Sequence, residues 1–99
     1  MMGMLSSSDL VPYLNQMFRV RLEGIEPIDL ELVSTTELGE VPSTEHRRPF
    51  SLIFLGPISS QYLVQHIYRL EHPQMGMLDL FLVPLGPEQG RMQYEAIFN

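Results

Sequence analysis

The most apolar stretch of the chain runs from Leu78 to Val83, where Asp79 is the one polar residue. Six residues are too few for an ordinary helix, and Pro84 and Gly86 follow directly, so the run predicts a β-strand. Alternate side chains of a strand point to opposite faces, and here both faces would be apolar. We therefore expect this strand to lie at the centre of a sheet with both faces covered.

Five further stretches are expected to form strands. They are residues 18–23, 28–32, 50–55, 64–71 and 92–98. The third of these is again largely apolar on both faces, whereas the others alternate apolar and polar side chains, as half-buried strands do. A short helix, capped by Ser8 or Asp9 with Pro12 in its first turn, is expected before the first strand.

The first two predicted strands would form a hairpin whose register is set by apolar matching. A slip of one residue would turn one set of apolar side chains to solvent, so the numbers of paired residues must have an even sum. The register that sets Leu22 opposite Ile28 satisfies this rule and also sets Arg19 opposite Glu31. Exposed ion pairs contribute only about 0.2–1 kcal/mol, so the apolar residues decide the register.

A second hairpin is expected between the central strand and the strand before it. Setting Arg69 opposite Asp79 gives the carboxylate of the central strand a partner, and the same register sets Ile67 opposite Phe81. A carboxylate left without a partner on a covered face would cost several kcal/mol or be protonated. In this arrangement His66 faces inward.

Strands joined mostly by short antiparallel connections predict a mainly β fold. We expect a small six-stranded antiparallel barrel, because closure removes exposed edges, with a two-sheet β-sandwich as the alternative. Residues 1–15 would form an N-terminal arm and short helix, and residues 16–99 a single β domain. The stretch 34–48 has no periodicity and is expected to be a long loop.

Charge narrows the range of partners. The 99 residues carry a net charge of −6, with six basic and twelve acidic residues, and every basic residue is an arginine. Between Arg21 and Arg47 the charged residues are all acidic. Such a chain lacks the cationic footprint that binding to nucleic acid or to an anionic membrane requires, so we expect neither partner. The absence of lysine also excludes a Schiff base and a Walker-type phosphate loop.

The sequence gives little sign of catalysis. It contains no cysteine and none of the common nucleophile, dinucleotide-binding or zinc-protease motifs. Its histidines, His46, His66 and His72, fall in different predicted elements, whereas a metal site needs several convergent ligands. We expect no enzyme, and hence no catalytic residue, bound metal, cofactor or small-molecule substrate. The N-terminal residues lack a secretory signal and no stretch is long enough to span a membrane, so we expect a cytoplasmic protein.

Several phrases of the sequence resemble a known bacterial family. Those that carry the resemblance are RPFSLIFLGP at 48–57, YRLEHPQMG at 68–76, LFLVPLGP at 80–87 and YEAIFN at 94–99. Over nearly its whole length the chain resembles the family called domain of unknown function 6916 (DUF6916). The resemblance implies a small single-domain protein without an assigned catalytic motif, in gene neighbourhoods of phage-tail-collar-like proteins.

We therefore expect a non-enzymatic structural or interaction module, a small assembly or accessory subunit that binds a protein partner or itself in a tail-like or fibre-like complex. It would act in the cytoplasm or within an assembled extracellular or phage-tail-like particle. The candidate interface combines the methionine-rich N-terminus, a basic pair in the long loop and side chains of the second hairpin. These residues are Met1, Met2, Met4, Leu5, Arg47, Arg48, Ile67, Met75, Met77 and Phe81.

The alternative function is a barrel that binds a small apolar ligand in its interior, although six strands leave little room there. The residues that would line such a site are Phe54, Tyr68, Leu80 and Phe98.

Overall fold

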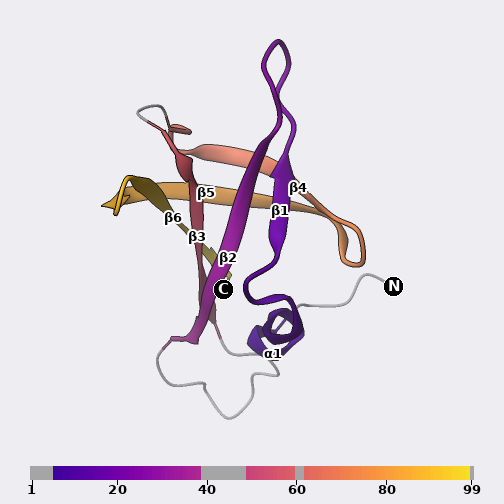
Figure 1. Ribbon diagram of the computed structural model, residues 1–99. Coiled ribbons are helices and arrows are strands. Elements are labelled where there is room, and N and C mark those ends of the chain that lie inside the picture. Colours follow the sequence, from indigo (N-terminus) through magenta and orange to yellow (C-terminus); the bar gives the residue numbers. More distant parts are fainter. Residues whose placement is uncertain (1–5, 39–48, 60–61, 99) are drawn as a thin grey trace.

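The computed structural model describes residues 6–38, 49–59 and 62–98, and the strands among them form a closed barrel (Figure 1). The elements are α1 (Ser7–Leu10), the 3-10 helix η1 (Val11–Tyr13), β1 (Met17–Val20), β2 (Ile28–Glu37), β3 (Phe50–Ile58), β4 (His66–His72), β5 (Gly76–Glu88) and β6 (Arg91–Phe98). The order around the barrel is β1-β2-β3-β6-β5-β4, and all neighbours are antiparallel. The predicted six-stranded antiparallel barrel with a short N-terminal helix is therefore confirmed, and the sandwich alternative is wrong.

Two long strands, β2 and β5, close the barrel because each pairs with different neighbours along its two halves. β2 pairs with β1 through residues 28–31 and with β3 through residues 31–37. β5 pairs with β4 through residues 76–82 and with β6 through residues 83–88. A register shift in each strand marks an irregularity of the bulge type, which bends a strand. Figure 1 shows the result, with β2 and β3 running along the height of the view and β4 and β5 running across it.

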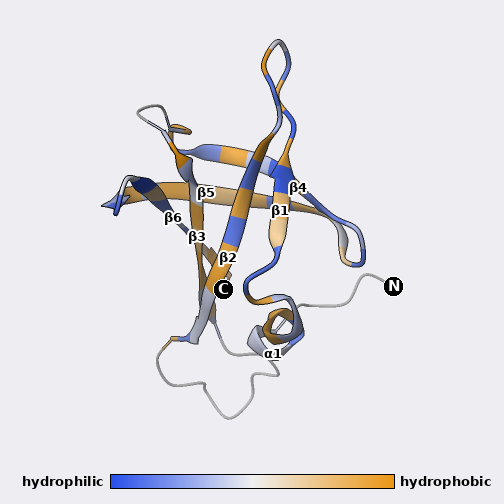
Figure 2. Cartoon of the chain, in the orientation of Figure 1, coloured by the Kyte–Doolittle hydropathy of each residue, from blue (hydrophilic) through white to orange (hydrophobic). Residues whose placement is uncertain are grey.

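Apolar side chains from all six strands fill the barrel, together with one residue of α1 and one of the connection between β3 and β4. The buried side chains are Leu10, Phe18, Val20, Leu30, Leu32, Phe50, Leu52, Phe54, Leu63, Tyr68, Leu70, Leu80, Leu82, Tyr94 and Ala96. Phe18 and Phe54 meet edge to face across the interior, with ring centroids 5.6 Å apart. Figure 2 shows apolar and polar residues alternating along the strands. One face of each strand thus lies in the core, and the other forms the outer surface.

Different segments close the two ends of the barrel. At one end α1 packs beside β2, where Leu10 is buried and the hydroxyls of Ser7 and Thr35 lie 2.9 Å apart. At the other end Leu63 is buried, and its backbone N–H donates a hydrogen bond of 2.8 Å to the hydroxyl of Tyr94. Both ends are therefore held by hydrogen bonds between segments far apart in the sequence.

The predicted N-terminal helix begins earlier than expected. Its N-cap is Ser6, whose backbone N–H donates to the carboxylate of Asp9 at 2.9 Å, as in a capping box. The predicted cap at Ser8 or Asp9 is wrong, because Asp9 occupies the third helical position and completes the cap from there. Pro12 lies in η1, at the start of a helical turn, where its missing N–H is tolerated.

The first hairpin has the predicted parity but a different register. The predicted pairing of Leu22 with Ile28 is wrong, because β1 ends at Val20 and Val20 itself pairs with Ile28. The shift of two residues also sets Arg19 opposite Asp29 instead of the predicted glutamate. Both registers keep the apolar side chains on one face, so the parity rule could not separate them.

The second hairpin has the predicted register throughout. Arg69 pairs with Asp79, and Ile67 pairs with Phe81. The expectation that both faces of the central strand are covered is wrong, however, because Asp79 and Phe81 are exposed. In a closed barrel a strand has two neighbours but only one covered face, so an apolar outer face on β5 lies open to solvent.

Two histidines lie differently from expectation. His66, predicted to face inward, is exposed at the start of β4, and its ring lies 5.5 Å from that of Tyr68. His66 is the first residue of β4 and lies at the end of the strand, whereas Tyr68 and Leu70, farther along the same face, are buried. His72, predicted in a turn, is the last residue of β4 and is buried.

Two long strands extend into stretches that the sequence analysis leaves outside the strands. The loop expected over 34–48 begins later, because β2 continues to Glu37. β5 likewise continues to Glu88, so the turn before β6 consists of Gln89 and Gly90. Part of the candidate interface lies outside the described residues, namely Met1, Met2, Met4, Leu5, Arg47 and Arg48.

Candidate functional site

The outer surface of β1, β4 and β5 carries an ordered arrangement of charged and apolar side chains, which we call the β1–β4–β5 face. One row crosses four strands, with Asp29 of β2 opposite Arg19, Arg19 opposite Glu71, and Glu71 opposite Met77. Two further rows follow along the β4–β5 hairpin, Arg69 with Asp79 and Ile67 with Phe81. Met17 of β1 and Arg21, which follows β1, complete the face.

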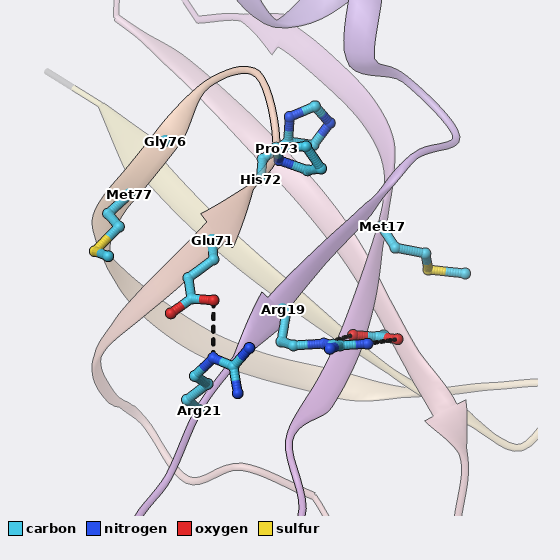
Figure 3. A pocket seen from close by; sticks show the side chains of 9 residues that line it. Met17, Arg19, Arg21, Glu71, His72, Pro73, Gly76 and Met77 are labelled. Carbon is cyan, nitrogen blue, oxygen red and sulfur yellow. Dashed lines mark hydrogen bonds and ion pairs between the residues drawn. The ribbon is translucent and has the colours of Figure 1, made fainter.

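Three ion pairs neutralise this face. The pairs, each with an arginine Nε and a carboxylate oxygen 2.9 Å apart, are Arg19 with Asp29, Arg21 with Glu71 and Arg69 with Asp79. Figure 3 shows the bond between Arg21 and Glu71 beside Arg19. The hydrogen bond from Arg69 holds the pKa of the Asp79 carboxyl below its ordinary value, and the bond to Asp29 raises the pKa of Arg19. Each pair joins one basic and one acidic side chain, so the formal charges of the three pairs cancel.

The remaining arginine of the described chain, Arg91, is also engaged. Its Nη2 lies 3.0 Å from Oε1 of Glu31, and its Nε donates to the carbonyl of Gly56 at 2.7 Å. Throughout residues 6–38, 49–59 and 62–98, every arginine thus has an acidic partner. Anionic ligands are usually bound by guanidinium groups that are free to form bidentate hydrogen bonds with them. Because these arginines are already paired with carboxylates, this part of the surface is poorly suited to an anionic ligand.

Apolar side chains of the predicted interface lie on the same face. Ile67 is 61 % exposed, and Phe81, directly opposite on β5, is 49 % exposed. Met77, four residues before Phe81 and on the same side of β5, is 62 % exposed. Met75 differs, because it is partly buried and packs against the core. The structure therefore places Ile67, Met77 and Phe81 on one face, with the Arg69–Asp79 row between Met77 and the other two, and leaves Met75 out.

A surface hollow of about 680 Å³ lies where β1 meets β4 (Figure 3). Met17 and Met77 stand on opposite sides of it, with the Arg19 and Arg21 ion pairs between them. Exposed methionines form an apolar rim whose flexible, polarizable side chains adapt to different partners. Met17, Arg19 and Arg21 were not predicted as parts of this face, because they meet β4 only through closure of the barrel and no local sequence pattern indicates that contact.

His72 lines the same hollow but serves the fold. Its Nε2 lies 2.7 Å from Oε1 of Gln16, and its Nδ1 accepts the backbone N–H groups of Gln74 and Met75 at 3.1 and 3.3 Å. Tyr13 packs edge-on against the imidazole, with ring centroids 4.8 Å apart. Both ring nitrogens are therefore occupied by structural hydrogen bonds.

The residues predicted to line an interior ligand site are part of the packed barrel. Phe54, Tyr68 and Leu80 are buried in the core, and Phe98 packs against it. A second hollow, of about 390 Å³, opens at the end of the barrel near Leu63, but none of these four residues lines it. Ligand binding inside the barrel stays a prediction.

Within the described ranges, no group of three or more His, Cys, Asp or Glu side chains is arranged to hold a metal ion. None of the helices in those ranges has the length and apolar character needed to cross a membrane.

Comparison with known proteins gives one result. No curated protein and no solved structure matches the chain. A family model described as domain of unknown function (DUF6916) matches residues 5–98. Because this match spans nearly the whole sequence, the chain belongs to the DUF6916 family.

Proposed function

We propose that the protein is a non-enzymatic interaction module that binds another protein subunit through the β1–β4–β5 face. The observation that carries the proposal is the direct pairing of Ile67 with Phe81 across β4 and β5, with 61 % and 49 % of these side chains exposed. Exposed apolar side chains that lie next to one another and are framed by polar groups mark protein interaction sites. The proposal thus rests on a cluster rather than on a single exposed residue.

The layout of the face supports docking. The side chains of Ile67 and Phe81 would form the dry centre of an interface, and the ion pair of Arg69 with Asp79 in the next row would border that centre with polar groups. Since these charges are paired before binding, a partner need not compensate an isolated charge. Arginine, methionine and aromatic side chains are also the types enriched in interfaces.

We further propose that this docking builds a multi-protein complex of the tail-like or fibre-like kind, in the cytoplasm or within an assembled particle. The support is the resemblance described in the sequence analysis, which implies gene neighbourhoods of phage-tail-collar-like proteins. A compact barrel that exposes one ordered face suits an accessory subunit, because such a face can be fixed against a neighbour with little conformational change.

A capture experiment with matched variants tests the proposal. The immobilised wild-type protein is exposed to extract of its native host, and retained proteins are identified by mass spectrometry. The double variant Ile67→Ser with Phe81→Ser is expected to lose proteins that the wild type retains. The control is Ile58→Ser on β3, which removes an isoleucine that is 79 % exposed but lies on a strand that neighbours neither β4 nor β5. Equal retention by both variants would overturn the proposal.

A further inference from the structure

We infer that the partner of the β1–β4–β5 face is a second copy of this chain, docked hairpin to hairpin about a two-fold axis. The inference rests on the proposed function, since it names the occupant of the same face. It follows from the charge distribution and from the order of the residue pairs along β4 and β5.

The β1–β4–β5 face differs in charge from the rest of the chain. The chain has six basic and twelve acidic residues, and the face uses three of each, in the pairs of Arg19, Arg21 and Arg69. The rest of the chain therefore has three basic and nine acidic residues, and carries the whole net charge of −6. Two copies repel each other wherever these acidic surfaces meet. The neutral face is where a second copy can approach without that repulsion.

The register of β4 with β5 makes the hairpin complementary to a second copy of itself. An isologous contact presents the same patch from both copies. A two-fold axis parallel to the strands and midway between β4 and β5 places β4 of one copy over β5 of the other. Because Arg69 pairs with Asp79 and Ile67 with Phe81 in the same register, this axis sets Arg69 of one copy over Asp79 of the other. It also sets Ile67 over Phe81. Each row of the hairpin is thus complementary to itself.

The available area is sufficient. A standard interface covers about 800 Å² on each partner, which is about an eighth of the 6591 Å² surface of this chain. The face spans three of the six strands of the barrel. An interface of ordinary size therefore fits on it.

The first test measures mass in solution. Sedimentation equilibrium of the wild-type protein, over about 1 µM to 1 mM, is expected to show a concentration-dependent species of twice the 11.4 kDa chain mass. The variant Ile67→Asp is expected to weaken this association by about 30-fold or more, because it places a charge at the centre of the contact. The control Ile58→Asp should associate as the wild type does.

Charge exchange gives the sharper test. Arg69→Asp and Asp79→Arg each place like charges over one another in a symmetric pair, so each variant is expected to be monomeric by itself. Mixing the two variants sets two arginines over two aspartates and is expected to restore a mixed dimer. The exchanged side chains are exposed, so circular dichroism should show an unchanged fold.

The outcomes separate the two proposals. A wild-type protein that stays monomeric at every concentration, or a dimer that both Ile67→Asp and the charge variants leave intact, would overturn the second-copy inference. If the monomeric protein still loses captured host proteins in Ile67→Ser with Phe81→Ser, the docking function stands with a different partner. If neither self-association nor capture depends on these residues, both proposals fail.

Discussion

The imidazole of His72 and the side-chain amide of Gln16 lie 2.7 Å apart, which ties the end of β4 to the segment just before β1. Because Nδ1 of this ring accepts backbone N–H groups of the following turn, Nε2 carries the proton and donates to Gln16. The register joins β1 to β4 through two residue pairs, fewer than any other neighbouring pair of strands in the described barrel. His72 therefore reinforces closure where the ladder is shortest.

Replacing this histidine should destabilise the barrel. His72→Ala leaves the amide oxygen of Gln16 and two backbone N–H groups without their partner, and removes a ring that lies 4.7 Å from that of Phe18. We expect the free energy of unfolding to fall by about 2–4 kcal/mol, measured by urea denaturation. The exposed His66 provides the control, since His66→Ala should change it by no more than about 0.5 kcal/mol. Equal losses in the two variants would contradict the role given to His72.

The hydroxyl of Tyr94 is expected to matter for the opposite end of the barrel. It accepts the backbone N–H of Leu63 at 2.8 Å in a buried position. Tyr94→Phe keeps the ring but leaves that N–H unsatisfied, so the free energy of unfolding should fall by about 1–3 kcal/mol. Tyr62→Phe, at an exposed position, should have almost no effect. Urea denaturation of both variants measures the difference, and a loss of equal size in Tyr62→Phe would count against the buried bond.

Stability is also expected to fall at alkaline pH. Burial raises the pKa of both Tyr68 and Tyr94 above the ordinary value for tyrosine. In the unfolded chain these phenols lose their protons near pH 10, whereas the folded protein keeps them to higher pH. The unfolded state then binds fewer protons, so the free energy of unfolding decreases as pH rises through this range and is unaffected well below it. Urea denaturation between about pH 8 and 11 should show a shallower decrease for Tyr94→Phe. If the free energy of unfolding decreases with pH equally in the wild type and in Tyr94→Phe, Tyr94 does not contribute to the alkaline destabilisation.

The two hairpins show how far sequence patterns determine pairing. Between β4 and β5 the turn is short, and the apolar and charged matches select one register, which sets Arg69 opposite Asp79. The connection between β1 and β2 is longer, and two registers of equal parity both match apolar residues and opposite charges. The choice between them depends on where β1 ends, at Val20, and on its second neighbour β4. A hairpin pattern carries no information about that third strand.

The candidate face was predictable to a similar extent. Ile67 and Phe81 follow from the hairpin register, and their exposure follows from a barrel with one covered face. The meeting of Arg21 with Glu71 joins residues 50 positions apart across the closing contact of β1 and β4. The hydrogen bond between Gln16 and His72 spans 56 positions. Contacts of this kind arise from closure of the whole barrel, so the spacing of residues within one segment does not predict them.

The turn between β5 and β6 offers a stabilising substitution. Gln89 and Gly90 both have positive φ, 54° and 83°, which is typical of a two-residue type I′ turn. Glutamine is strained at such an angle, whereas asparagine adopts it more readily. Gln89→Asn is therefore expected to raise the free energy of unfolding by about 0.5–1 kcal/mol in urea denaturation. The β-branched control Gln89→Val should lower it, because a branched side chain fits positive φ poorly. If the asparagine variant unfolds at lower urea concentration than the wild type, backbone strain at Gln89 does not reduce the free energy of unfolding.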